Sequence, residues 1–235
     1  MIAPFSSKTV LVAGGTGGLG RAVTLALLTE GARVSVTYRK REELVVLKAA
    51  AGAAHGRLEG YEADVTDETA ARGLVEAVRA RQGRLDVLVN SVGGFAGGKK
   101  LWEEDASLLD RMLGLNLRSG WTLARAAVPV MLAQGRGAIL NVAAQAALAP
   151  PAGLAAYAAS KAAAVALFAS LAAELAGSGV RVNSILPSII DTPANRNAMP
   201  AADFSKWPKP EEIARVVLFL CSDEAKLVNG AAIPV

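Results

Sequence analysis

The stretch "TVLVAGGTGGLGRAVTLALLTEGARVSVTY", residues 9–38, decides the fold. It begins with a short apolar, β-branched run, continues through a glycine cluster into a helix-like segment, and ends on a second apolar run. Gly14, Gly18 and Gly20 stand at the strand-to-helix turn, where missing side chains let the backbone approach a diphosphate and donate N–H groups to it. This context predicts dinucleotide binding, and an incidental glycine turn is the alternative.

The same alternation of short apolar runs and longer helix-like segments continues along nearly the whole chain. Parallel strands that are buried on both faces have continuous apolar sequences, and they need helical crossovers. We therefore predict one α/β domain over residues 1–235, a doubly wound, Rossmann-type, seven-stranded parallel sheet flanked by helices. The predicted strands are residues 9–13, 33–38, 57–63, 85–90, 137–142, 180–186 and 231–235.

Composition and charge exclude several classes of protein. Hydrophobic residues make up 52% of the chain and charged residues 20%, which is the balance of a compact α/β protein. The single cysteine, Cys221, rules out an internal disulfide and suits a reducing cytoplasm. Lys and Arg exceed Asp and Glu by 25 to 21, but this surplus is spread along the chain, which argues against nucleic-acid binding. We expect no metal site, signal peptide or membrane span, and a cytoplasmic location.

The end of the second predicted strand bears on the choice of cofactor. A nucleotide with a free ribose hydroxyl would favour an acidic residue there, but Thr37 and Tyr38 occupy that place. Arg39 and Lys40 follow, and their donors suit a 2′-phosphate. The sequence therefore favours NADP(H) over NAD(H), and an ordinary solvated basic turn is the alternative.

A tyrosine and a lysine lie four residues apart in the alanine-rich stretch "YAASKAA". On a helix, this spacing places the Tyr157 phenol and the Lys161 ammonium on one face. A nearby positive charge favours the phenolate, so we expect Lys161 to lower the pKa of Tyr157 and to make it a general acid or base. A pair of surface side chains without a chemical role is the alternative.

These motifs, in this order, resemble the short-chain dehydrogenase/reductase family over nearly all 235 residues. That family has a GxxxGxG turn, an NNAG-like strand end, an asparagine in the fourth helix and a YxxxK pair. Here the corresponding features are the glycine turn, "LVNSVGG" from Leu88, Asn116, Tyr157 and Lys161. The resemblance implies an NAD(P)-dependent oxidoreductase in which Asn116, Tyr157 and Lys161 are catalytic.

The resemblance also implies individual roles. Lys161 would hold the nicotinamide ribose, and Asn116 would anchor a water chain to Tyr157, with the capping of a helix kink as the alternative for Asn116. Asp64 and Val65 would hold the adenine, Asn90 would close the adenine side, and residues 187–192 would receive the nicotinamide carboxamide. The expected cofactor-binding residues are Gly14, Thr16, Gly17, Gly18, Leu19, Gly20, Arg39, Lys40, Asp64, Val65, Asn90, Tyr157, Lys161, Pro187, Ile190 and Thr192.

One family residue is missing. The family pattern has a serine thirteen positions before the tyrosine, and that position is Ala144 here. Losing one donor to a developing oxyanion costs on the order of a hundredfold in rate, about 3 kcal/mol. Three interpretations remain open: Gln145 or another donor substitutes, the substrate needs no such donor, or the protein is a catalytically silent regulator that binds the nucleotide without turnover.

Three segments resemble the quinonoid dihydropteridine reductases, which also lack this serine. They are "LPSIIDTPANRNAMPAADFSKW" (186–207), "VGGFAGG" (92–98) and "AAQAALAPPAG" (143–153). We expect an NADPH-dependent reductase of a carbonyl or of a conjugated imine or quinonoid substrate. Within enzymes, the alternatives are a specific dihydropteridine reductase and a generic ketone or 3-oxoacyl reductase. The candidates for lining the substrate pocket, with plain packing as their alternative, are Phe95, Trp102, Ala144, Gln145, Met199 and Trp207.

The predicted helix 157–176 bears on assembly because it is apolar nearly all round and rich in small residues. A helix without a polar face must be covered, and small residues allow another helix to approach closely. We expect a homodimer or homotetramer formed through this helix, as the resemblance also implies. Burial within one subunit is the alternative.

Overall fold

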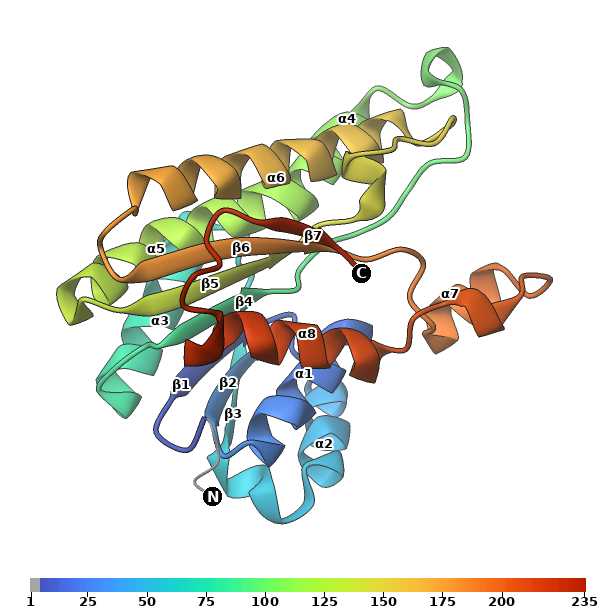
Figure 1. The fold of residues 1–235 in the computed structure, drawn as a ribbon. Helices are drawn as coiled ribbons and strands as arrows, with labels where there is room; N and C mark the ends of the chain where they lie inside the picture. Colours follow the sequence, from blue (N-terminus) through green and yellow to red (C-terminus); the bar gives the residue numbers. More distant parts are fainter. Residues whose placement is uncertain (1–4) are drawn as a thin grey trace.

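A seven-stranded parallel sheet forms the centre of the computed structural model, which describes residues 5–235 (Figure 1). The strand order is β3-β2-β1-β4-β5-β6-β7, so the direction of winding reverses between β1 and β4. Sheets of this kind bind ligands outside the carboxyl ends of the strands at such a switch point. The predicted fold is therefore confirmed. The strands are β1 Thr9–Ala13, β2 Arg33–Tyr38, β3 Leu58–Glu62, β4 Val87–Asn90, β5 Gly137–Val142, β6 Val180–Leu186 and β7 Ala232–Pro234.

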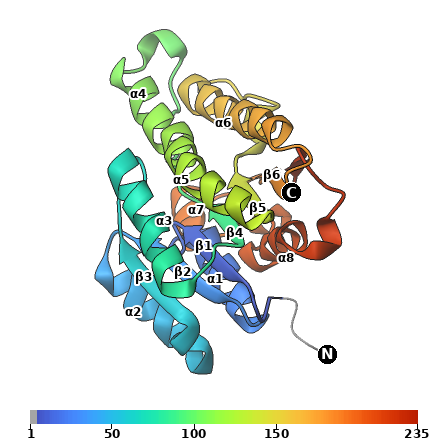
Figure 2. The same ribbon diagram turned by 90° about the vertical axis from the view of Figure 1, so that its left-hand side faces the viewer.

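Helices cover both faces of the sheet (Figure 2). Helices α1, α2 and α8 pack on one face, and α3, α5 and α6 pack on the other. A further segment, which includes α7, extends away from the sheet in Figure 1. The helices are α1 Gly18–Thr29, α2 Arg41–Ala50, α3 Glu68–Gln82, α4 Ser107–Leu113, α5 Ser119–Gln134, α6 Ala155–Glu174, α7 Pro193–Ala198 and α8 Pro210–Cys221.

The first strand shows why the apolar runs are continuous. Val10 and Val12 belong to the core beneath α1 and α8, whereas Leu11 and Ala13 belong to the core beneath α3 and α5. Successive side chains of a strand point to opposite faces, so a strand that is covered on both faces needs an apolar residue at every position. This requirement is what made the strands recognisable in the sequence.

Helix α6 starts at Ala155 and ends at Glu174, two residues before each end of the predicted helix. By length and composition alone it is apolar enough to cross a membrane, and 33% of its most apolar window is buried within this fold. It packs against α4 and β6. Packing within the domain therefore accounts for part of its apolar surface, and the rest is open to a further contact.

One arginine ties the end of α8 to the sheet. Arg181, on β6, donates to the carbonyl oxygens of Leu220 and Ser222 at 2.8 Å each and to that of Val228 at 3.3 Å. The carbonyls at the end of a helix have no partner within the helix, and the guanidinium fork supplies one. Burial lowers the pKa of Arg181, although the group stays charged.

We predict that Arg181→Met lowers the free energy of unfolding by about 2–4 kcal/mol, because the apolar stem remains while three carbonyls lose a charged donor. Urea denaturation measures the change. Arg215→Met, on the exposed face of α8, is the matched control and should stay within about 0.5 kcal/mol of the parent protein. Equal losses in the two variants would contradict this account of Arg181.

Candidate functional site

The glycine turn between β1 and α1 is closely packed. A Cβ atom on Gly20 would lie 2.1 Å from the Gly14 carbonyl oxygen, so only glycine fits there. Gly14 has a φ of 75°, and its N–H donates to the Thr37 hydroxyl at 2.8 Å. Thr37, at the position where a free ribose would favour an acid, is therefore buried and holds the turn. The turn leaves bare backbone at the amino end of α1, as a bound diphosphate requires.

A cavity of about 190 Å³ opens beside this turn, at the ends of β1, β2, β3 and β4. Most of the predicted adenosine-side residues meet around it, and the segment after β4 closes it. Lys40 does not line it but precedes α2 as an exposed N-cap residue, and the Leu19 side chain packs into the core. The lining residues are Gly14, Thr16, Gly17, Thr37, Tyr38, Arg39, Glu43, Ala63, Asp64, Val65, Ser91, Val92 and Gly93.

Two predicted residues, Asp64 and Asn90, form hydrogen bonds that hold the turns next to the cavity. Asp64 accepts from the N–H and the hydroxyl of Thr66 at 2.9 and 2.7 Å, and these bonds hold its pKa below the usual value. Asn90 is fully buried, donates to the Asn141 amide oxygen at 3.1 Å and accepts from the Val92 N–H at 3.3 Å. Asn90 does not line the cavity itself, so any part that it has in closing the adenine side is exerted through the turn after β4. Asn90 shapes the turn after β4, and Val92 and its neighbours form the wall.

The segment after β6 reaches back to the glycine turn. A Cβ atom added at Gly18 would lie 3.0 Å from the Thr192 methyl group, so the Thr192 side chain lies close to the glycine turn. Pro187 accepts a hydrogen bond from the Gln145 N–H at 3.0 Å, and Ile190 packs against the core. This segment therefore covers the region between the glycine turn and the start of α6, as the nicotinamide end of a dinucleotide would require.

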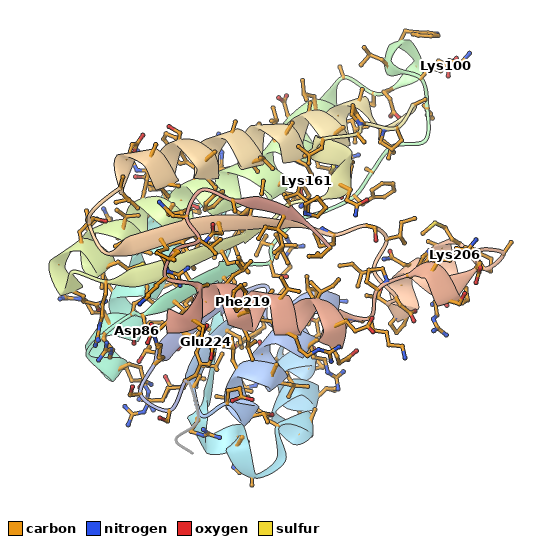
Figure 3. The ribbon with its side chains drawn as sticks, in the orientation of Figure 1. Asp86, Lys100, Lys161, Lys206, Phe219 and Glu224 are labelled. Atoms are coloured by element: carbon orange, nitrogen blue, oxygen red, sulfur yellow. The ribbon has the colours of Figure 1, made fainter. Side chains whose placement is uncertain are left out.

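Lys161 is a buried cation at the end of β5. Lys161 is 6% exposed (Figure 3). Its Nζ donates a hydrogen bond to the Val142 carbonyl oxygen at 3.1 Å. A Cβ atom on Gly93 would lie 3.1 Å from Nζ, so the loop after β4 also closes onto the ammonium. Burial lowers the pKa of Lys161 to about 8. An ammonium has three donors, and this one makes a single hydrogen bond within residues 5–235, which leaves donors for the hydroxyls of a ligand.

Tyr157 lies one turn before Lys161 on α6 and is partly buried. The Phe95 ring meets it edge to face, with 5.0 Å between the ring centroids and 70° between the planes. Burial raises the pKa of Tyr157. The prediction that Lys161 lowers this pKa is wrong for the protein by itself, because the ammonium is directed to the Val142 carbonyl. The phenol is therefore protonated at neutral pH.

Asn116 connects the loop after β4 to α6. It lies in a π-helical turn, Gly114–Arg118, between α4 and α5, and it is 2% exposed. Its amide accepts from the Gly94 N–H at 2.8 Å and donates to the Gly94 carbonyl at 3.1 Å and to the Ser160 hydroxyl at 2.9 Å. Ser160 donates in turn to the Tyr157 carbonyl at 2.7 Å. These bonds hold the loop against the turn of α6 that carries the phenol.

The predicted substrate residues divide into two groups. Phe95 lies against Tyr157, and Ala144 is buried just after β5. Gln145 is exposed and directs its amide to the Val235 carbonyl at 3.5 Å, at the limit of a hydrogen bond. Met199 directly follows α7, and Trp207 packs on Phe204. The segment that includes α7 extends away from the sheet (Figure 1), and the expected place of both residues in a substrate pocket stays a prediction.

Some remaining groups play no part in this site. Trp102 is 79% exposed and has the Lys100 ammonium 5.4 Å above its ring, so it is a surface residue in this structure. Burial raises the pKa of the Cys221 thiol to about 12. In the described range 5–235, no three His, Cys, Asp or Glu side chains come together as a metal site.

Sequence reasoning missed several residues of the site. Glu43 lines the cavity without matching a motif, and Ser91, Val92 and Gly93 line it from within "LVNSVGG", where no individual role is predicted for them. Ser160, within "YAASK", carried a usable signal because it lies three residues after Tyr157, where a serine hydroxyl can bond back to a helix carbonyl.

Comparison with known proteins identifies relatives over the whole fold. A family profile described as short chain dehydrogenase matches residues 8–203. The 3-oxoacyl-[acyl-carrier-protein] reductase of Thermotoga maritima is 35% identical over 236 residues, covering 96% of this chain and 95% of the relative. The D-threitol dehydrogenase of Mycolicibacterium smegmatis is 37% identical over 235 residues, covering 95% and 89%. The solved structure of an NAD+-bound xylitol dehydrogenase has a TM-score of 0.91 at 27% identity and covers 98% of both chains.

We predict that affinity for a nicotinamide dinucleotide falls as the pH rises through about 8, because Lys161 loses its proton there and gives up a charge and a donor. The Kd should rise by about three- to tenfold between about pH 7 and 9 in calorimetric titrations. Lys161→Met should bind weakly and show little change over this range. An equally steep dependence in Lys161→Met would assign the effect to another group.

Proposed function

Because the chain belongs to the short-chain dehydrogenase/reductase family and is an oxidoreductase, we propose that it is an NADPH-dependent reductase with Tyr157 as its proton donor. The observation that carries the proposal is the pair on α6, in which a partly buried, protonated phenol lies one turn from a buried ammonium with free donors. The relatives are oxidoreductases, which counts against the alternative of a catalytically silent regulator.

The residues that would hold the cofactor form a continuous path. The bare backbone at Gly14–Gly20 suits the diphosphate. Arg39 in the adjoining cavity suits a 2′-phosphate, Lys161 suits the nicotinamide ribose, and the segment 187–192 suits the carboxamide. When bound, a reduced nicotinamide supplies the hydride. Proteins of the same fold are bound to NAD+ or to NADP, so the preference for NADPH rests on Arg39 and on the absence of an acid at Thr37 and Tyr38.

Proton delivery follows from the surroundings of Tyr157. Burial keeps the phenol protonated, so in the reductive direction it acts as a general acid toward the substrate atom that gains negative charge. Asn116 and Ser160 hold the backbone that carries it. The reverse oxidation needs the phenolate and is therefore favoured at higher pH.

The substrate class follows from what faces the phenol. Ala144 offers no hydroxyl to a localised oxyanion, and Phe95 presents an aromatic wall beside Tyr157. Both features suit a flat acceptor that spreads its charge over a conjugated ring, such as a quinonoid dihydropterin. The second candidate is a ketone or 3-oxoacyl substrate, which is favoured by the relationship to the 3-oxoacyl-[acyl-carrier-protein] reductase.

We also propose a cytoplasmic homodimer or homotetramer that buries the outer faces of α4, α5 and α6. Leu109, Trp121 and Leu132 on α4 and α5 are 44–48% exposed. Helix α6 adds an apolar surface of small residues. A partner subunit would cover the exposed apolar side chains of α4 and α5 and the apolar surface of α6.

We predict that Tyr157→Phe lowers kcat for NADPH oxidation by about 10²–10⁴-fold, because the proton donor is lost. The Kd for NADPH, measured by fluorescence titration, should change by less than about twofold because the ring and Lys161 remain. The control is Tyr61→Phe, on strand β3, whose hydroxyl donates to Glu59 and contacts neither Tyr157 nor Lys161, and it should keep full turnover. Unchanged turnover in Tyr157→Phe would end this assignment.

We predict that Ala144→Ser raises kcat/KM for simple ketones by about 10- to 100-fold, because the hydroxyl adds a donor to a localised oxyanion. Activity on quinonoid dihydropterin should change little, since its charge is delocalised. A steady-state screen of ketones, quinones, 3-oxoacyl thioesters and quinonoid dihydropterin measures the difference. An equal gain on every substrate would count against the proposed acceptor class.

A further inference from the structure

The cavity beside the glycine turn is lined by a carboxylate from helix α2, although the end of β2 carries no acidic residue. Glu43, in the first turn of α2, lines this cavity together with Arg39 and Thr16. Its Oε2 accepts a hydrogen bond from the Thr16 hydroxyl at 2.9 Å. Because Thr16 belongs to the glycine turn, this bond fixes the carboxylate beside the region where a nucleotide diphosphate and its adenosine ribose would lie.

Arg39 and Glu43 are available to a ligand in this cavity. Among residues 5–235, neither forms an ion pair within 4.0 Å. Arg39, just after β2, lines the cavity together with Asp64. The cavity of about 190 Å³ is therefore lined by one guanidinium, Arg39, and two carboxylates, Glu43 and Asp64, of which Asp64 accepts two hydrogen bonds from Thr66.

The charges of Arg39 and Glu43 favour different nucleotides. A carboxylate accepts hydrogen bonds from the 2′- and 3′-hydroxyls of a free ribose, and it repels a phosphate on the 2′-oxygen. A guanidinium binds that phosphate and gains little from a hydroxyl. At separations of a few ångströms within a cavity, neither effect is fully screened by salt.

We propose that Glu43 is a cofactor-specificity residue that opposes Arg39, so that its charge limits the preference of the site for NADPH over NADH. It supplies, from one helical turn further along the chain, the acid that Thr37 and Tyr38 do not provide. This inference rests on the proposed function, because it assumes that the adenosine ribose lies in this cavity.

The test compares three variants of the whole chain by calorimetric titration with NADP+ and with NAD+. Glu43→Gln keeps the size of the side chain and removes its charge. It should tighten NADP+ by about 5- to 20-fold and weaken NAD+ by about two- to fivefold. Glu42→Gln removes an equal charge from the same first turn of α2 but does not line the cavity. It should leave the ratio of the two Kd values within about twofold of the parent.

Arg39→Gln separates this inference from the proposed preference for NADPH. It should weaken NADP+ by at least about tenfold and leave NAD+ nearly unchanged. If Arg39→Gln has no effect but Glu43→Gln shifts the ratio, the preference assigned to Arg39 fails and the inference stands. Three results would overturn the inference: an unchanged ratio in Glu43→Gln, an equal shift in Glu42→Gln, or an equal loss for both nucleotides, which would indicate a role in holding the glycine turn.

Discussion

The structure of the site depends on the burial of one ammonium group. Lys161 lies beneath the loop after β4, and its Nζ donates to the Val142 carbonyl at the end of β5. A buried charge is costly unless polar groups meet it. For this reason the end of β5, the first turns of α6 and the backbone at Gly93 must converge. The same convergence places Tyr157 at the opening of the site and leaves donors of the ammonium for a ligand.

A hydrogen-bonded chain holds this arrangement from the other side. Asn116 links the backbone of Gly94 to Ser160, and Ser160 links to the Tyr157 carbonyl. The π-helical turn that carries Asn116 interrupts an otherwise continuous helix, as such turns often do at functional sites. Position and protonation of the phenol therefore have separate causes: the hydrogen bonds fix its place, and burial keeps its proton. Both support a donor in the reductive direction.

The sheet could be predicted from sequence because strands covered on both faces leave a continuous apolar pattern, as in Val10–Ala13. The Tyr157 and Lys161 pair could be predicted because helical spacing alone places both on one face. Whether the pKa of Tyr157 is raised or lowered could not be predicted, since this depends on where the Lys161 ammonium points. Glu43 could not be predicted, because its contact with Thr16 joins two elements that are separate in sequence. The course of the segment that carries Met199 could not be predicted either, because no local pattern shows that it extends away from the sheet.

The most direct test of the central claim is a crystal structure of the protein with NADP+ bound. The account predicts that Lys161 Nζ lies within hydrogen-bonding distance of a hydroxyl of the nicotinamide ribose, with the Tyr157 hydroxyl facing the nicotinamide ring. It would be contradicted if the ribose lay elsewhere while Lys161 still bound only the Val142 carbonyl, or if the Tyr157 hydroxyl pointed away from the ring.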